Sequence, residues 1–79
     1  MDLGKAIKGG KAVYANGEHE AVVNFNGVTP NGKNAFDVHE HTKGVGHVTG
    51  VCLNAREAVE TLQQRGVPTD CGWIDETKK

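Results

Sequence analysis

The sequence is short, and it has few cysteines, few aromatic residues and no long apolar run. It has two cysteines and four aromatic residues in 79 positions. No apolar run approaches the ~20 residues that a membrane-spanning helix needs. The N-terminal residues, Met-Asp-Leu-Gly-Lys, lack the charged and then apolar pattern of a signal peptide. We therefore expect one cytoplasmic domain over residues 1–79, with loose order at residues 1–10 and 76–79.

Neither sign of charge dominates, and the common catalytic motifs are missing. The formal net charge is −1, which argues against a basic nucleic-acid-binding arm and against an acidic DNA mimic. The chain has no Walker loop, no G-x-G-x-x-G, no C-x-x-C and no H-E-x-x-H. Cys52 and Cys71 could form one disulfide at most, fewer than small secreted domains usually carry, so we expect two free thiols. We expect a protein that is not an enzyme and holds no cofactor.

Valine and glycine are abundant, and both favour a sheet over a helical bundle. There are ten Val, three Leu and eleven Gly, and β-branched residues are enriched in strands. Three Asn-Gly pairs, beginning at Asn16, Asn26 and Asn31, are typical of tight turns because both residues tolerate positive φ. Alternating apolar residues between these turns predict four strands: Lys11–Ala15, Glu18–Asn26, Asn34–Thr42 and His47–Leu53.

The period of the apolar residues then changes from two to that of a helix. Asn54 followed by Glu57 forms a capping-box pattern. Gly66 and Pro68 supply the stop, which predicts a helix over Ala55–Arg65. A helical turn over Asp2–Lys8 and a short strand over Cys71–Asp75 are also expected. The fold class is therefore α+β: a four-stranded antiparallel β-meander with one C-terminal α-helix packed on one face, and a candidate fifth strand.

The register of the hairpins decides which side chains share a face. The Asn16-Gly17 turn predicts Tyr14 opposite His19. A loop over Lys43–Gly46 would place Val38 opposite Val51 and Phe36 opposite Leu53. The register shifted by one residue would place His41 opposite His47 and leave Val51 facing water. We expect the first register, because it gathers more apolar side chains on one side.

This register divides the side chains between a buried face and an open face. The buried face should pack against Ala58, Val59 and Leu62 of the helix. Its strand residues are Tyr14, Val23, Phe25, Phe36, Val38, Val51 and Leu53. The open face is expected to carry the candidate interface residues Val22, Asp37, His39, His41, Val48 and Cys52.

The polar residues of the open face permit more than one chemistry. An H-x-H pair on a strand projects two imidazoles to one side, so His39, His41, Cys52 and Asp37 could ligate zinc. His39 beside Cys52 could activate the thiol. The histidines could also form a titrating contact surface without a metal. The fourth and simplest interpretation is a polar sheet surface that faces solvent and binds no ligand.

Two resemblances bear on function. The order of elements is similar to that of double-stranded-RNA-binding domains, but Asn54-Ala55-Arg56-Glu57 lacks the lysine cluster of those domains, so nucleic acid is not the expected partner. In size and sheet-plus-helix plan the chain resembles small phage inhibitors of host defence, such as anti-CRISPR proteins. That resemblance is of architecture and assigns no residue a role.

Together these features predict a non-enzymatic binding module that docks on a protein partner, plausibly as an inhibitor, or forms a homodimer through the open face. The alternatives are a small zinc-binding domain built on His39, His41, Cys52 and Asp37, and an oligomeric nucleotide sponge.

Overall fold

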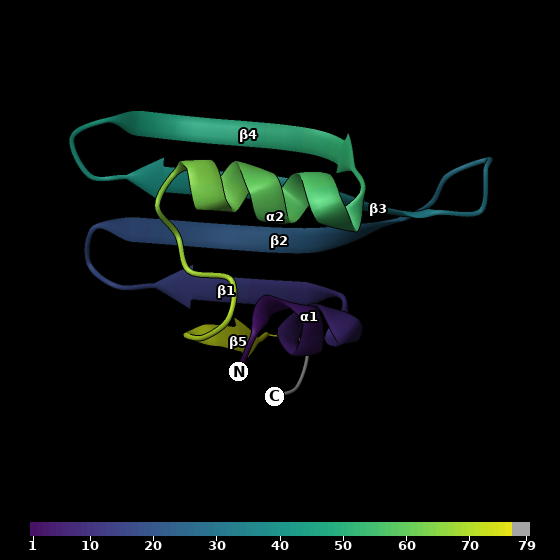
Figure 1. Ribbon diagram of the computed structural model, residues 1–79, viewed down its shortest axis with the longest axis horizontal. Coiled ribbons are helices and arrows are strands. Elements are labelled where there is room, and N and C mark those ends of the chain that lie inside the picture. The colour runs from purple at the N-terminus through teal and green to yellow at the C-terminus, as the bar shows by residue number, and fades with distance from the viewer. Residues whose placement is uncertain (77–79) are drawn as a thin grey trace.

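Five antiparallel strands form one sheet in the computed structural model, which describes residues 1–76 (Figure 1). The strand order is β4-β3-β2-β1-β5, so the chain runs as a meander and the last strand returns beside the first. The predicted α+β fold is confirmed, including the fifth strand. The strands are β1 (Lys11–Ala15), β2 (His19–Val28), β3 (Asn34–Thr42), β4 (Gly46–Leu53) and β5 (Trp73–Asp75).

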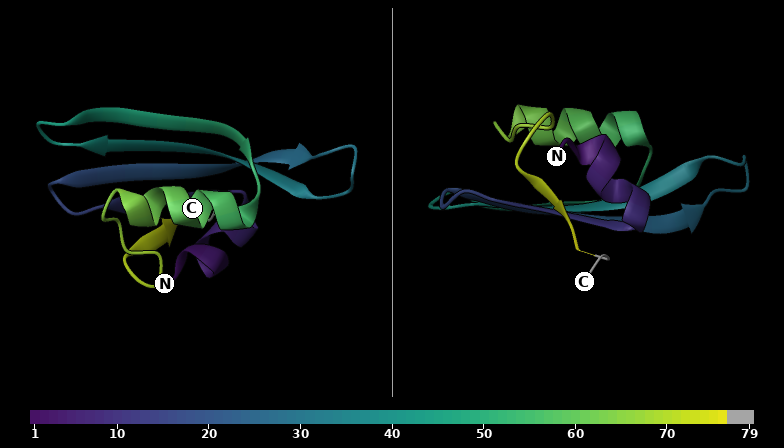
Figure 2. Two further views of the ribbon diagram at one scale, coloured as in Figure 1. Left: turned by 45° about the horizontal axis from the view of Figure 1, so that its top comes forward. Right: turned by 90° about the horizontal axis from the view of Figure 1, so that it is seen from below.

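Both α-helices lie on the same side of the sheet, and within residues 1–76 no helix covers the other side (Figure 2). The longer helix, α2 (Ala55–Gln64), follows β4 and packs on β3 and β4. The core between the layers is small, as expected for so short a chain. Its largest fully buried apolar side chains are Trp73, Leu62, Val23, Val38 and Val67.

Helix α2 begins where the sequence predicts. The Asn54 side chain accepts a hydrogen bond from the backbone N–H of Glu57 (2.8 Å), and the Glu57 carboxylate accepts one from the backbone N–H of Asn54 (3.1 Å). This reciprocal capping box satisfies two N–H groups that the helix leaves free. The helix ends before Gly66, whose φ of +79° is a conformation that glycine adopts at little cost.

The N-terminal segment is ordered by contacts with the chain just before β5. Helix α1 (Leu3–Ala6) continues into a 3₁₀ turn over Ile7–Gly9. Leu3 and Ala6 are buried, and the Leu3 N–H donates to the Thr69 carbonyl (3.0 Å). The burial of Leu3 places this segment against the core, and the loose order expected over residues 1–10 stays a prediction. Residues 77–79 of the predicted loose C-terminus lie outside the described residues.

The β1–β2 loop is wider than expected. Tyr14 pairs with Ala21 and not with His19, so the predicted Tyr14–His19 pair is wrong. The Asn16 side chain accounts for the difference, because its Oδ1 accepts from the backbone N–H groups of Glu18 (3.0 Å) and His19 (2.8 Å). The shift is of two residues, so Tyr14 and Ala21 remain on the buried face.

The β3–β4 register combines the two alternatives. Phe36 pairs with Leu53 as expected, but Val38 pairs with Gly50 and His41 with His47. The predicted Val38–Val51 pair is wrong, and Val51 is 63% exposed. The change occurs at a β-bulge after Gly50, where Cys52 has a φ of +57°. One extra residue in β4 restores the Phe36–Leu53 pair beyond the bulge.

Gly50 explains why the bulge is tolerated on the buried face. A Cβ atom at Gly50 would lie 2.7 Å from Leu53 Cδ1, so the Leu53 side chain occupies the space beside the Gly50 backbone. Leu53 thereby packs against the core although Val51 does not. The bulge also changes which side chains of β4 face the helix: Val48 pairs with the buried Glu40 and lies on the helix side.

The β2–β3 hairpin projects beyond the rest of the molecule (Figure 1). A second register shift, between Phe25 and Gly27, marks its base. At the tip, the Thr29 N–H donates to the Lys33 carbonyl (2.8 Å) and the Gly32 N–H donates to the Thr29 carbonyl (2.8 Å). Pro30 occupies the second position of this turn, where its fixed φ is favourable. The hairpin tip is therefore held by its own hydrogen bonds.

The register predicts opposite effects on stability for the same substitution at Val38 and at Val51. Val38→Asp should unfold the domain, because Val38 is fully buried and the new carboxylate would have no partner. Val51→Asp should leave the melting temperature within a few degrees of the wild type, because Val51 is largely exposed. Thermal melts followed by circular dichroism at low protein concentration test both. Unfolding of the Val51→Asp protein would show that β4 follows the register without a bulge.

Candidate functional site

The uncovered face of the sheet is the candidate interaction surface, and we refer to it as the open face. One row of side chains crosses all five strands there. Val13 of β1 pairs with Ile74 of β5 on one side and with Val22 of β2 on the other, and the row continues through His39 and Thr49. Because directly paired residues in an antiparallel sheet point to the same face, these five side chains lie side by side.

The row is apolar at one end. Ile74 is 64% exposed, and Val13 and Val22 are half-buried although no helix covers them. The three form an apolar band of one side chain from each of β5, β1 and β2. A single exposed apolar residue is ordinary on a protein surface, but a continuous band on an uncovered sheet is a feature of contact surfaces.

Three histidines lie at the other end of the open face. The imidazoles of His41 and His47 are in contact, with ring centroids 4.4 Å apart and an interplanar angle of 34°. Glu20 pairs with His41 from the opposite side, on β2. His39 lies one step along β3, and its Nδ1 is 3.4 Å from the Thr49 hydroxyl. A shallow hollow of about 250 Å³ lies among these side chains, which is less than drug-sized ligands usually occupy.

The structure shows on which face the predicted interface residues lie, and their role in an interface stays a prediction. Val22, Asp37, His39 and His41 lie on the open face, because they alternate with the buried residues of β2 and β3. Val48 was assigned to this face wrongly, since the bulge turns it towards the helix. His47 and Thr49 take its place. Sequence reasoning missed them because it assumed a regular strand through Cys52.

Cys52 is close to Asp37. Its backbone N–H donates to Asp37 Oδ1 (3.2 Å), and the Asn26 side chain donates to Asp37 Oδ1 (3.0 Å) and lies 3.7 Å from Cys52 Sγ. The Cys52 and Cys71 thiols are both free, as predicted. Within residues 1–76, no three His, Cys, Asp or Glu side chains are grouped so that they could hold a metal ion. The four candidate zinc ligands are therefore not assembled into one site.

The helix side of the molecule carries a second hollow, of about 620 Å³. It lies between the N-terminal helical segment and the base of the β2–β3 hairpin. Phe25 and Phe36 line it in an edge-to-face arrangement, with ring centroids 5.8 Å apart. Phe25 was expected in the core but is 43% exposed, because it borders this hollow.

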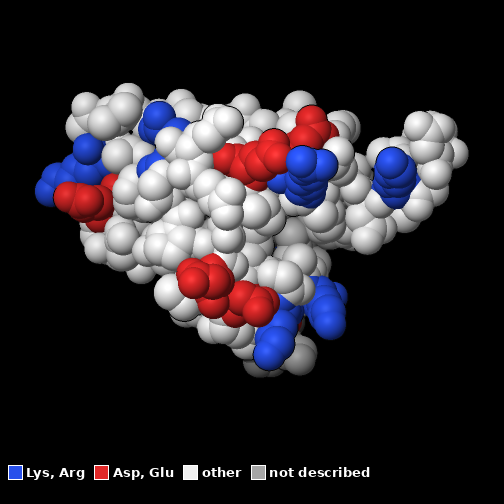
Figure 3. Space-filling view, in the orientation of Figure 1, with Lys and Arg blue, Asp and Glu red and all other residues white. Residues whose placement is uncertain are grey.

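Elsewhere on this side, acidic and basic side chains form small separate groups (Figure 3).

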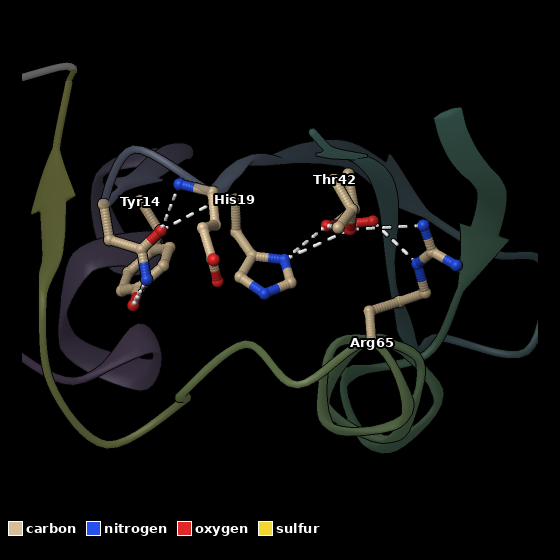
Figure 4. Close-up of polar contacts among 7 residues, drawn as sticks. Tyr14, His19, Thr42 and Arg65 are labelled. Carbon is tan, nitrogen blue, oxygen red and sulfur yellow. Dashed lines mark hydrogen bonds and ion pairs between the residues drawn. The ribbon is translucent and has the colours of Figure 1, made fainter. Parts of the chain in front are cut away.

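The most unusual polar group is the buried carboxylate of Glu40, which connects the sheet to the end of α2. Its partners His19, Thr42 and Arg65 are labelled in Figure 4. Its side chain has no exposed area. Arg65 Nε donates to Glu40 Oε2 (2.7 Å), and the Thr42 hydroxyl donates to Oε1 (2.5 Å). His19 Nδ1 lies 2.9 Å from Oε1 and must carry the proton, because a carboxylate can only accept.

These contacts keep Glu40 ionised. Burial alone would raise its pKa, but the hydrogen bonds from Thr42, His19 and Arg65 have the larger effect and lower the pKa from 4.5 to about 2. Glu40 follows Phe36 and Val38 at intervals of two, so strand alternation alone places it on the buried face.

Comparison with protein-family models, with curated proteins and with solved structures gives no match to this chain. In the described part of the chain, no helix is long and apolar enough to cross a membrane. Function must therefore be inferred from the geometry of the chain itself.

The Glu40 contacts predict how stability depends on pH. Because the pKa is lower in the folded state, Glu40 stabilises the fold fully above about pH 4.5, and this contribution disappears as the pH falls towards 2. At about 1.4 kcal/mol per pH unit, the contribution is on the order of 3 kcal/mol. Urea unfolding should show that wild-type stability falls more steeply between pH 5 and pH 2 than that of Glu40→Gln.

Glu60→Gln is the matched control for this experiment. It makes the same chemical change in an exposed ion pair with Arg56, 3.1 Å away, where a small effect is expected. If Glu60→Gln and Glu40→Gln had equal effects on the pH dependence, the buried network would not be the source of the stabilisation.

Proposed function

We propose that this protein is a non-enzymatic binding module whose open face docks on a protein partner. The observation that carries the proposal is the apolar band of Ile74, Val13 and Val22 on a sheet face that no helix covers. Apolar side chains at the centre of a patch, with polar groups around them, are the usual composition of a protein–protein contact.

The groups beside the band indicate what the partner should present. Two histidines, His39 and His41, continue the same surface on β3, and His47 continues it on β4. The carboxylates of Glu20 and Asp37 lie on the same face, so this end of the surface carries both imidazoles and carboxylates. The surface therefore suits a partner with an apolar patch flanked by polar groups that can form hydrogen bonds with the imidazoles and carboxylates. An inhibitor that covers a site on a larger protein would use such a surface.

The proposal predicts that an acid in the apolar band abolishes partner binding. Ile74→Asp should weaken binding by roughly tenfold or more, because it buries a charge against the partner's apolar patch. Ala55→Asp is the matched control: it adds the same carboxylate at an exposed position of α2, on the opposite side of the molecule. Proteins bound from an extract of the source cells to immobilised wild type and to both variants can be compared quantitatively by mass spectrometry.

A partner that is recovered with the wild type and Ala55→Asp but not with Ile74→Asp would support the open face as the contact surface. A partner lost only with Ala55→Asp would move the contact to the helix side and contradict the proposal, as would extracts that yield no protein specific to the wild type.

A further inference from the structure

Strand β4 is a long sheet edge without the usual protection. It is the outermost strand on its side, and its eight residues, Gly46–Leu53, include no proline and no acidic, lysine or arginine residue. Natural sheets usually protect such an edge with charges, prolines, β-bulges or very short strands, because its free backbone groups can pair with another strand. The bulge of β4 comes only after Gly50, so the first part of the strand, Gly46–Gly50, remains a regular edge. The opposite edge is protected in this way, since β5 has three residues and ends in Asp75.

The hydrogen bonds show which backbone groups of β4 are directed outward. The Lys43 N–H donates to the Glu18 carbonyl (2.8 Å), so odd-numbered residues of β3 bond to β2 and even-numbered ones bond to β4. The partners of Thr42, Glu40 and Val38 on β4 are Gly46, Val48 and Gly50. The alternate residues therefore direct backbone groups to the free edge, and these are His47, Thr49 and Val51.

We propose that β4 pairs with β4 of a second copy of this chain, antiparallel and around a two-fold axis at Thr49. A two-fold axis that relates two antiparallel strands of one continuous sheet is perpendicular to that sheet, so both copies keep the same face of the sheet on the same side. Paired residues must point to the same face, so odd-numbered residues pair with odd-numbered ones and even-numbered residues with even-numbered ones. The stretch from Gly46 to the bulge residue Cys52 is centred on Thr49. In this register Thr49 exchanges hydrogen bonds with Thr49 of the other copy, and the Val51 N–H of each copy donates to the His47 carbonyl of the other.

The side chains fit this register. On the open face, the two Thr49 side chains meet, a favourable cross-strand pair, and each Val51 lies beside His47 of the other copy. Val51 is 63% exposed in the single chain and becomes covered. On the helix side, Val48 lies opposite Gly50, where no side chain competes for space. No like charges of acidic or basic residues face each other across the axis, as self-pairing requires.

The helices leave room for the second copy. Helix α2 packs on β3 as well as on β4. The two β3 strands would be three strand spacings apart, or about 14 Å. Helices in contact lie 8–10 Å apart, so the two α2 helices would neither clash nor be needed for the contact. The interface goes beyond the proposed function, because it uses the edge of the sheet and leaves the open face of each copy free.

A charge placed at the axis tests the pairing. Thr49→Lys should weaken dimerisation roughly tenfold or more, because the two ammonium groups would meet across the two-fold axis. Thr49→Val keeps the β-branched shape and should dimerise like the wild type. Ile74→Lys adds the same charge at the far end of the same row and should also dimerise normally. Sedimentation velocity over a wide range of protein concentrations measures each, with circular dichroism confirming that every variant is folded.

A wild type that stays monomeric at every concentration would overturn the inference, and so would a Thr49→Lys protein that dimerises as the wild type does. Loss of the dimer in Ile74→Lys alone would assign the contact to the open face. Because Ile74→Asp tests partner binding and Thr49→Lys tests the dimer, the two proposals can fail independently.

Amide hydrogen exchange provides an independent readout in the unmodified protein. The N–H groups of His47, Thr49 and Val51 should exchange at least roughly tenfold more slowly at high protein concentration than at low concentration. The N–H groups of Val48 and Gly50, which bond to β3, should exchange at the same rate in both. Equal behaviour of the two sets would contradict the pairing. Protection of the first set only when a foreign protein is added would replace the second copy with a foreign strand.

Discussion

The extra residue at the β4 bulge is the constraint on which the arrangement of the surface depends. Without it, one register would have to hold along the whole β3–β4 pair, and either Leu53 would leave the core or His41 and His47 would separate. The bulge satisfies both ends of the strand. Gly50 favours it, because a Cβ atom there would lie 2.7 Å from Leu53 Cδ1 and the Leu53 side chain would have to move. The bulge thus lets imidazoles gather on one side of the sheet while a leucine fills the other.

The buried hydrogen-bond network around Glu40 joins the sheet to the end of helix α2. Its members are His19 at the start of β2, Glu40 and Thr42 of β3, and Arg65, which follows α2. One carboxylate therefore joins three segments that are distant in the sequence. Burying a charge is costly unless the charged group is fully hydrogen-bonded. The Glu40 carboxylate has hydrogen bonds with His19, Thr42 and Arg65. Arg65 is partly exposed, which lowers the cost of desolvating the pair. The network therefore orients the end of α2 on the sheet more specifically than apolar packing alone would.

What could be predicted from the sequence was local. The bounds of β1 and β3 and the start of α2 follow from turn residues, alternation and the capping box, all of which act over a few positions. The bulge could not be predicted, because it requires Cys52 in a left-handed conformation and the contact between Leu53 and Gly50. The burial of Glu40 was readable from alternation, but its partner Arg65 lies 25 residues away and is brought near by tertiary packing. The open face was therefore predicted correctly in β3 and incorrectly in β4.

The return of β5 to the side of β1 has a consequence for how the chain reaches this state. Hairpins between neighbouring strands close short loops and can form early, whereas the pairing of Val13 with Ile74 joins residues from opposite ends of the sequence. During synthesis the N-terminal residues leave the ribosome first, so β1 is an open edge until the last segment follows. In that interval the nascent sheet has two unprotected edges instead of one. The arrival of Trp73 and its neighbours closes one of them, which makes the final residues a safeguard against misassembly as well as part of the core.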